Sequence, residues 1–71
     1  MTQTPSARIR TLLLRADNVL KNEGDPDDRE RRARLALEEA RDIATRDQTV
    51  EPRVLELIER RLSALDAGGP G

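Results

Sequence analysis

Apolar residues recur along this chain at intervals of three and four residues, in three blocks separated by short polar breaks. This spacing places the apolar side chains on one face of a helix, because an α-helix turns by about 100° per residue. The blocks predict helices over residues of about 5–23, 26–45 and 51–66. Since short connections favour antiparallel neighbours, we expect an all-α, up-down-up bundle of three helices within residues 1–67.

Each predicted helix has an apolar face that we assign to the core. The first face contains Ile9, Leu12, Leu13, Ala16, Val19 and Leu20. The second contains Ala33, Ala36, Leu37, Ala40, Ile43 and Ala44, and the third contains Val54, Leu55, Ile58, Leu62 and Leu65. Because the second face consists mainly of alanine, we expect the neighbouring helix backbones to approach it closely.

The residues at the breaks fit the ends of these helices. Thr4 and Asp25 each precede a proline and are expected N-caps, because their side-chain oxygens can accept a hydrogen bond from an unpaired amide. Gly24 favours the end of the first helix, since glycine adopts positive φ without a steric penalty. Pro52 fits only the first turn of the third helix. The Gly- and Pro-rich residues 68–71 predict a flexible tail.

The composition narrows the chemistry that the chain can perform. The 71 residues include no cysteine, histidine, phenylalanine, tyrosine or tryptophan, so neither a thiol nor an imidazole is available for catalysis or metal binding at neutral pH. We therefore predict that the chain is not an enzyme and that it binds neither a cofactor nor a metal ion. Charged residues make up 38% of the chain at a net charge of −1, which provides no overall attraction to a polyanion.

Three leucines lie outside the apolar faces. Leu14 and Leu35 point away from the core faces of their helices, and Leu57 lies at the margin of its own. Single exposed leucines are common on protein surfaces. The alternative is that these leucines help to form a second apolar surface for a protein partner or a second copy of the chain, with Arg10 and Arg31 as its polar rim.

Arginines are concentrated in the first two predicted helices. Such clusters can neutralise phosphates, which raises the alternative of a nucleic-acid-associated regulator. Acidic residues are interleaved with these arginines, however, and the chain has no aromatic side chain on which a base could stack. A solvated surface whose charges pair with one another is the favoured interpretation, so we do not expect a nucleic acid partner.

The spacing of Ala33, Leu37 and Ala40 is similar to that in the second helix of a tetratricopeptide-type hairpin. The first helix of such a hairpin would have to cross Gly24 and the following proline, and no period of about 34 residues recurs. The sequence is therefore assigned to no family.

The sequence favours a small, non-catalytic helical module for protein–protein interaction, acting as an adaptor, a regulator or a subunit, either as a monomer or as a homodimer. No apolar run approaches the about 20 residues of a membrane span, and no secretory signal precedes the first helix, so the expected location is the cytoplasm. Lys21 is the only lysine among 13 basic residues, a bias that suggests a bacterial source. The residues between the second and third helices could also act as a hinge for exchange of the third helix between chains.

Overall fold

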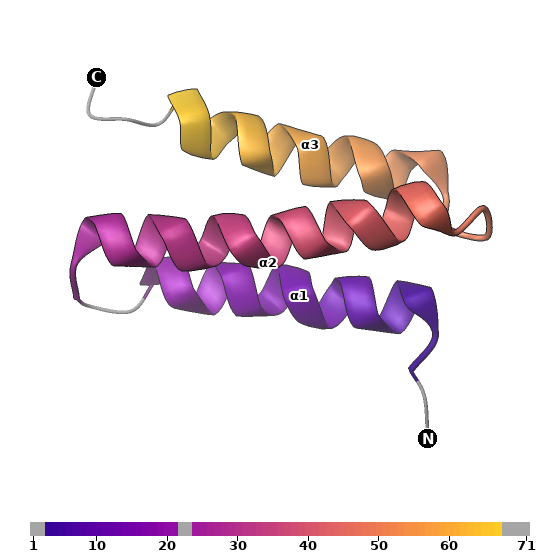
Figure 1. The fold of residues 1–71 in the computed structure, drawn as a ribbon, viewed down its shortest axis with the longest axis horizontal. Coiled ribbons are helices and arrows are strands. Elements are labelled where there is room, and N and C mark those ends of the chain that lie inside the picture. Colours follow the sequence, from indigo (N-terminus) through magenta and orange to yellow (C-terminus); the bar gives the residue numbers. More distant parts are fainter. Residues whose placement is uncertain (1–2, 22–23, 68–71) are drawn as a thin grey trace.

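A computed structural model describes residues 3–21 and 24–67, and it contains three α-helices. These helices are α1 (Pro5–Lys21), α2 (Pro26–Arg46) and α3 (Pro52–Ala67). They run antiparallel to their neighbours along the chain (Figure 1), which confirms the predicted all-α, up-down-up arrangement. The predicted end of the first helix at Glu23 and the predicted tail at 68–71 lie outside the described residues.

The N-caps of the first two helices have the predicted geometry. The amide of Ala7 donates a hydrogen bond of 3.1 Å to Oγ1 of Thr4, and the amide of Asp27 donates one of 3.1 Å to Oδ1 of Asp25. Gly24, just before the second cap, has a φ of 149°, a conformation that favours glycine. These side chains satisfy amides that the helices leave unpaired.

A hydrogen-bonded turn joins α2 to α3. The amide and the hydroxyl of Thr49 both donate to Oδ1 of Asp47, over 2.9 and 2.5 Å. The amide of Asp47 donates to the carbonyl of Ile43 and ends α2. Val50 follows this turn and is buried in the core, which fixes the connection between the two helices.

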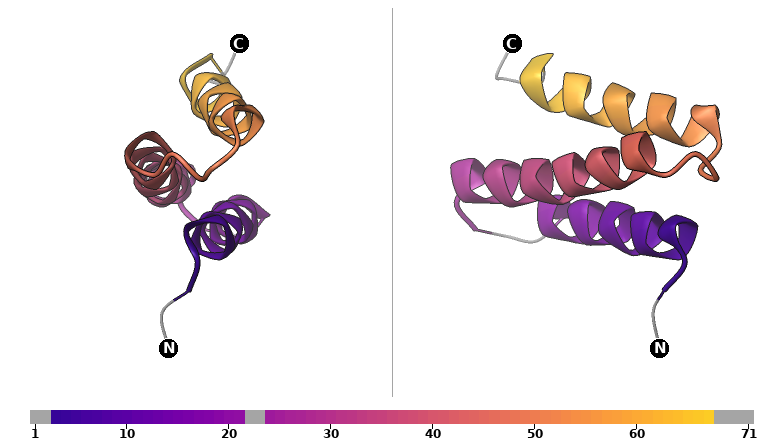
Figure 2. Two further views of the ribbon diagram at one scale, coloured as in Figure 1. Left: turned by 90° about the vertical axis from the view of Figure 1, so that its right-hand side faces the viewer. Right: turned by 45° about the vertical axis from the view of Figure 1, so that its right-hand side comes forward.

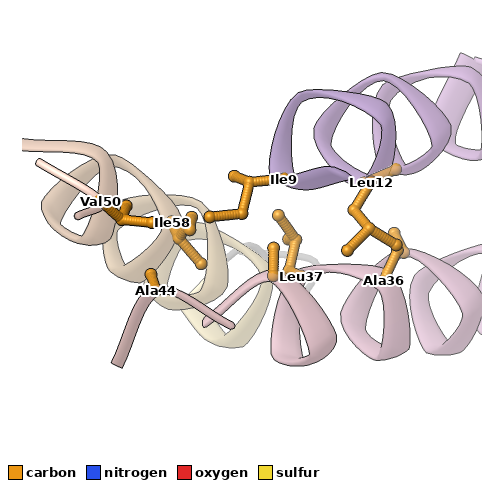
Figure 3. Packing of buried hydrophobic residues seen from close by; sticks show 10 residues of the cluster. Ile9, Leu12, Ala36, Leu37, Ala44, Val50 and Ile58 are labelled. Atoms are coloured by element: carbon orange, nitrogen blue, oxygen red, sulfur yellow. The ribbon is translucent and has the colours of Figure 1, made fainter. Parts of the chain in front are cut away.

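The core consists mainly of residues from the three predicted faces. Ala33, Ala40 and Ile58 are fully buried, and Figure 3 shows Leu37 of α2 directed toward Ile9 of α1. The alanines let α1 and α3 approach α2, and the larger aliphatic side chains fill the remaining space. The buried residues are Ile9, Leu12, Ala16, Ala33, Ala36, Leu37, Ala40, Ala44, Val50 and Ile58.

The core differs from the predicted one at three residues. Two residues assigned to it lie outside it, and one residue not assigned to it is buried. Leu20 is 40% exposed and Val19 is half-buried outside the core, because each lies at an edge of the α1 face rather than at its centre. Val50 was not assigned to the core, since it precedes the helical repeat of α3, yet it is buried.

The middle helix holds the bundle together. α2 packs against both α1 and α3, more extensively against α1, whereas α1 and α3 make little direct contact. The view along the helices in Figure 2 shows the two outer helices spread apart on the side away from α2. None of the helices in residues 3–21 and 24–67 is long and apolar enough to cross a membrane.

Candidate protein interface

Because α1 and α3 do not close against each other, an open groove lies between them, which we call the α1/α3 groove. It contains two hollows. The N-terminal hollow is lined by Ser6, Ile9, Arg10, Leu13, Val54 and Leu57. The C-terminal hollow is lined by Ala16, Asp17, Leu20, Leu37, Arg61, Ala64 and Leu65. Both hollows are lined mainly by aliphatic side chains, so the groove continues the core toward solvent.

In residues 3–21 and 24–67, one ion pair crosses the groove, at the C-terminal hollow. Nη1 of Arg61 on α3 lies 2.6 Å from Oδ1 of Asp17 on α1, and both side chains are partly exposed. The pair connects the two walls where they do not pack directly. Both residues line the C-terminal hollow, whereas the N-terminal hollow precedes them on both helices.

Two leucines leave a large part of their apolar surface in water at this groove. Leu57 is 41% exposed in the N-terminal hollow and Leu20 is 40% exposed in the C-terminal hollow. Each leucine lies at the edge of the apolar face of its helix, and that face continues into the core. A contiguous apolar surface of this kind is typical of interaction sites, whereas isolated surface leucines are not.

Cations border the groove. Arg10 lines the N-terminal hollow, and Lys21 lies one helical turn beyond Asp17 on the same edge of α1. On α3, Arg53 precedes Leu57 by four residues and Arg60 follows it by three, which places both at the outer edge of that wall.

The pairing of these cations leaves most of their charge available. Within residues 3–21 and 24–67, no ion pair is formed by Arg10, Lys21 or Arg60, and Arg53 pairs only with exposed Glu51 at 3.6 Å. The groove therefore has a positive border around an apolar floor.

The five residues that the sequence predicted as partner contacts do not lie together in the structure. Leu57 and Arg10 meet in the N-terminal hollow. Leu14 is 57% exposed and lines no hollow described above, although its helical position is next to Arg10 and Asp17 on the edge of α1. All three predicted leucines are exposed, but they do not line one hollow together.

The remaining two predicted residues lie on α2. Leu35 is 61% exposed and lines a separate hollow between α1 and α2, together with Leu12, Arg15, Val19, Arg32, Ala36 and Glu39. Arg31 is exposed and pairs with Asp28 at 3.5 Å. Neither side chain contributes to the α1/α3 groove.

Several groove residues were not predicted as contacts. Leu13 and Leu20 were assigned to the core, and Asp17, Arg61 and Ala64 were not singled out. One indication was present in the sequence: the apolar faces of the first and third helices are wider than the alanine-rich helix between them can cover. The rotation of each helix about its axis, which decides what stays open, could not be read from the sequence.

The arginines of α2 are largely paired with acids of the same chain. Arg32 pairs with Asp28 at 3.1 Å, and Arg34 pairs with both Glu30 and Asp66. The hydrogen bond and charge of Asp66 raise the pKa of Arg34 above its ordinary value. On the α1 side, Arg8 pairs with Glu39 at 2.7 Å. Each of these positive charges therefore lies beside a negative one, whereas most of the cations at the border of the α1/α3 groove have no such partner.

The side chains that line the groove are mainly aliphatic. In the described part of the chain, no polar or charged side chain is buried, and no group of three acidic residues is placed to hold a metal ion. The two hollows measure about 180 and 200 Å³, below the about 300–1,000 Å³ of typical small-molecule sites. They suit inserted side chains better than a cofactor.

Comparison of the chain with protein-family models, with curated proteins and with solved structures finds no match in any of the three. The groove itself is therefore the basis for assigning a function.

Proposed function

We propose that this protein is a small, non-catalytic module for protein–protein interaction, and that the α1/α3 groove is its contact surface. The observation that carries the proposal is the open, aliphatic groove with Leu20 and Leu57 partly exposed at its edges. A chain of this size has few apolar residues for its core. Because Leu20 and Leu57 stay partly exposed, they stabilise the folded chain less than fully buried leucines would. Binding of another protein would bury this surface.

The alternative of a nucleic-acid-associated regulator has less support. Its expected contacts were the arginines of the first two helices, but Arg8, Arg31, Arg32 and Arg34 each pair with an acid of the same chain. Neutralising phosphates would require breaking these pairs. A cytoplasmic location and a role as adaptor, regulator or subunit remain part of the proposal.

A capture experiment tests this function. The immobilised protein is exposed to a lysate of its source cells, alongside the variants Leu57→Glu and Leu35→Glu. We expect a discrete partner to be retained by the wild type and by Leu35→Glu but lost with Leu57→Glu, because Leu57 lines the groove and Leu35 lies outside it. Equal capture by all three, or tight salt-sensitive binding of DNA or RNA in a low-salt gel shift, would contradict the proposal.

A further inference from the structure

We infer that the α1/α3 groove binds one amphipathic helix of a partner protein, with apolar residues on one face and acidic residues along both edges of that face. This inference rests on the proposed function and specifies the partner. It follows from three features of the groove: the arrangement of its walls, the spacing of its hollows and the charge at its border.

The arrangement of the walls leaves one helix position vacant. α2 packs against both outer helices on one side, and α1 and α3 lie spread apart on the other side (Figure 2). A helix placed between α1 and α3, opposite α2, would complete a four-helix bundle. Amphipathic helices commonly bind proteins by laying an apolar face into such a groove.

The spacing of the hollows fits a helix. On α1 the hollows are formed by residues 6–13 and 16–20, and on α3 by residues 54–57 and 61–65. On both walls the centres are about eight residues apart, which corresponds to about 12 Å along a helix. Two apolar side chains seven or eight positions apart on one bound helix have nearly this separation. One of these side chains would enter the hollow that Asp17 and Arg61 line.

The charge at the border favours acidic edges on the bound helix. Arg10 and Lys21 flank the α1 wall, and Arg53 and Arg60 flank the α3 wall. The one acid that lines the hollows, Asp17, is already paired with Arg61. Because the whole chain carries a net charge of −1, the positive border is a local feature of this groove. Such a border attracts acidic residues and repels basic ones.

The same charge disfavours a second copy of the chain as the occupant. A two-fold dimer through the groove would bring two positive borders together. The exposed Leu35 of a second copy has Arg31 and Arg32 beside it as well as acids, so it does not supply acidic edges. A contact between Leu35 and the groove would also join different surfaces, which tends to produce open chains rather than closed dimers.

Fluorescence anisotropy with synthetic peptides tests the inference on the full chain. The probe is a labelled, alanine-rich peptide of about five helical turns, with two leucines seven positions apart and glutamates along both edges of the leucine face. One control peptide has lysine in place of each glutamate, and another has the second leucine moved to the opposite face. We expect the acidic probe to bind at least about tenfold more tightly than either control, with affinity falling as salt is added.

Variants of the protein locate the binding. Leu57→Glu and Arg10→Glu should each weaken binding of the acidic probe by about tenfold or more, because they place a negative charge in or beside the N-terminal hollow. The matched controls are Leu35→Glu and Arg41→Glu, both on α2 and away from the groove, and these should leave affinity unchanged within about twofold. Circular dichroism verifies that all four variants remain helical.

Three outcomes would overturn the inference: no binding of the acidic probe, equal binding of the acidic and basic peptides, or a wild-type dimer whose formation Leu57→Glu abolishes. Each outcome differs from a failure of the proposed function. A partner that is captured through Leu57 without any preference for acidic helices would leave the proposed function intact and exclude this type of partner.

Discussion

Arg61 of α3 donates a hydrogen bond from Nη1 to Oδ1 of Asp17 over 2.6 Å, and in the described part of the chain this is the one ion pair that joins α3 to α1. Other ion pairs between helices connect α2 with an outer helix, as Arg34 does with Asp66. α1 and α3 pack little against each other, so this polar contact is a main direct link between the two walls of the groove.

Removing this ion pair should have a small effect on stability. We expect Asp17→Asn to lower the free energy of unfolding by at most about 1 kcal/mol, because both side chains are partly exposed and screened by solvent. Urea denaturation measures the change. A double-mutant cycle with Arg61→Gln isolates the coupling between the two residues, and a loss of several kcal/mol would show that the pair contributes more than a surface contact.

Enlarging a buried alanine should destabilise the bundle. Ala40 is fully buried in the middle of α2, so Ala40→Leu must displace neighbouring side chains or a helix, at a cost of about 1–3 kcal/mol. Thermal or urea unfolding checks this value. Ala64→Leu is the matched control, because Ala64 is exposed on α3 and the same substitution there should change stability by less than about 0.5 kcal/mol. Equal effects at both sites would contradict the tight packing at α2.

The N-cap of α2 should contribute measurably to folding. Asp25→Ala removes the acceptor for the amide of Asp27 and should lower the free energy of unfolding by about 0.5–2 kcal/mol. Asp25→Ser should recover much of the loss, because serine is also a good N-cap. If alanine and serine gave the same stability in urea denaturation, the hydrogen bond would not be the source of the effect.

The turn after α2 should make part of the stability dependent on pH. The hydroxyl and the amide of Thr49 hold the pKa of Asp47 below its ordinary value. A carboxyl whose pKa is lower in the folded state contributes stability above its unfolded pKa, and this contribution is lost as the pH falls through the folded pKa. The loss should therefore begin below about pH 4 and continue as the solution becomes more acidic.

NMR titration of the Asp47 carboxyl tests this assignment directly. Thr49→Val removes the hydroxyl donor and keeps the amide, so the pKa of Asp47 should rise toward its ordinary value. Gln48→Ala, a substitution of the exposed neighbour within the same turn, should leave that pKa unchanged. A wild-type pKa already at the ordinary value would show that the turn does not stabilise the carboxylate.

The helices were predictable because local features determine them. Thr4 and Asp25 cap their helices as expected, and the start of each helix and the ends of α2 and α3 fall within one residue of the predicted positions. The alanine-rich face of α2 could likewise be assigned to the core, since every apolar residue of α2 except Leu35 lies on it.

The groove was less predictable because it depends on how the helices pack. Leu20 and Leu57 both lie at the edge of an apolar face, and only the rotation and separation of α1 and α3 decide that both stay partly exposed. The burial of Val50 depends on the turn formed by Asp47 and Thr49, which lies outside any helical repeat. Leu14, Leu35 and Arg31 line neither hollow of the groove, so the proposed interface does not use these predicted contacts.

The central position of α2 implies an order of local opening. Either outer helix can detach while the other keeps its contacts, whereas loss of α2 removes the support of both. α3 should detach first, because Ile58 is its only fully buried side chain in the described region. Its amide protons should then exchange with solvent sooner than those around Ala40, and a helix bound between α1 and α3 would slow that exchange.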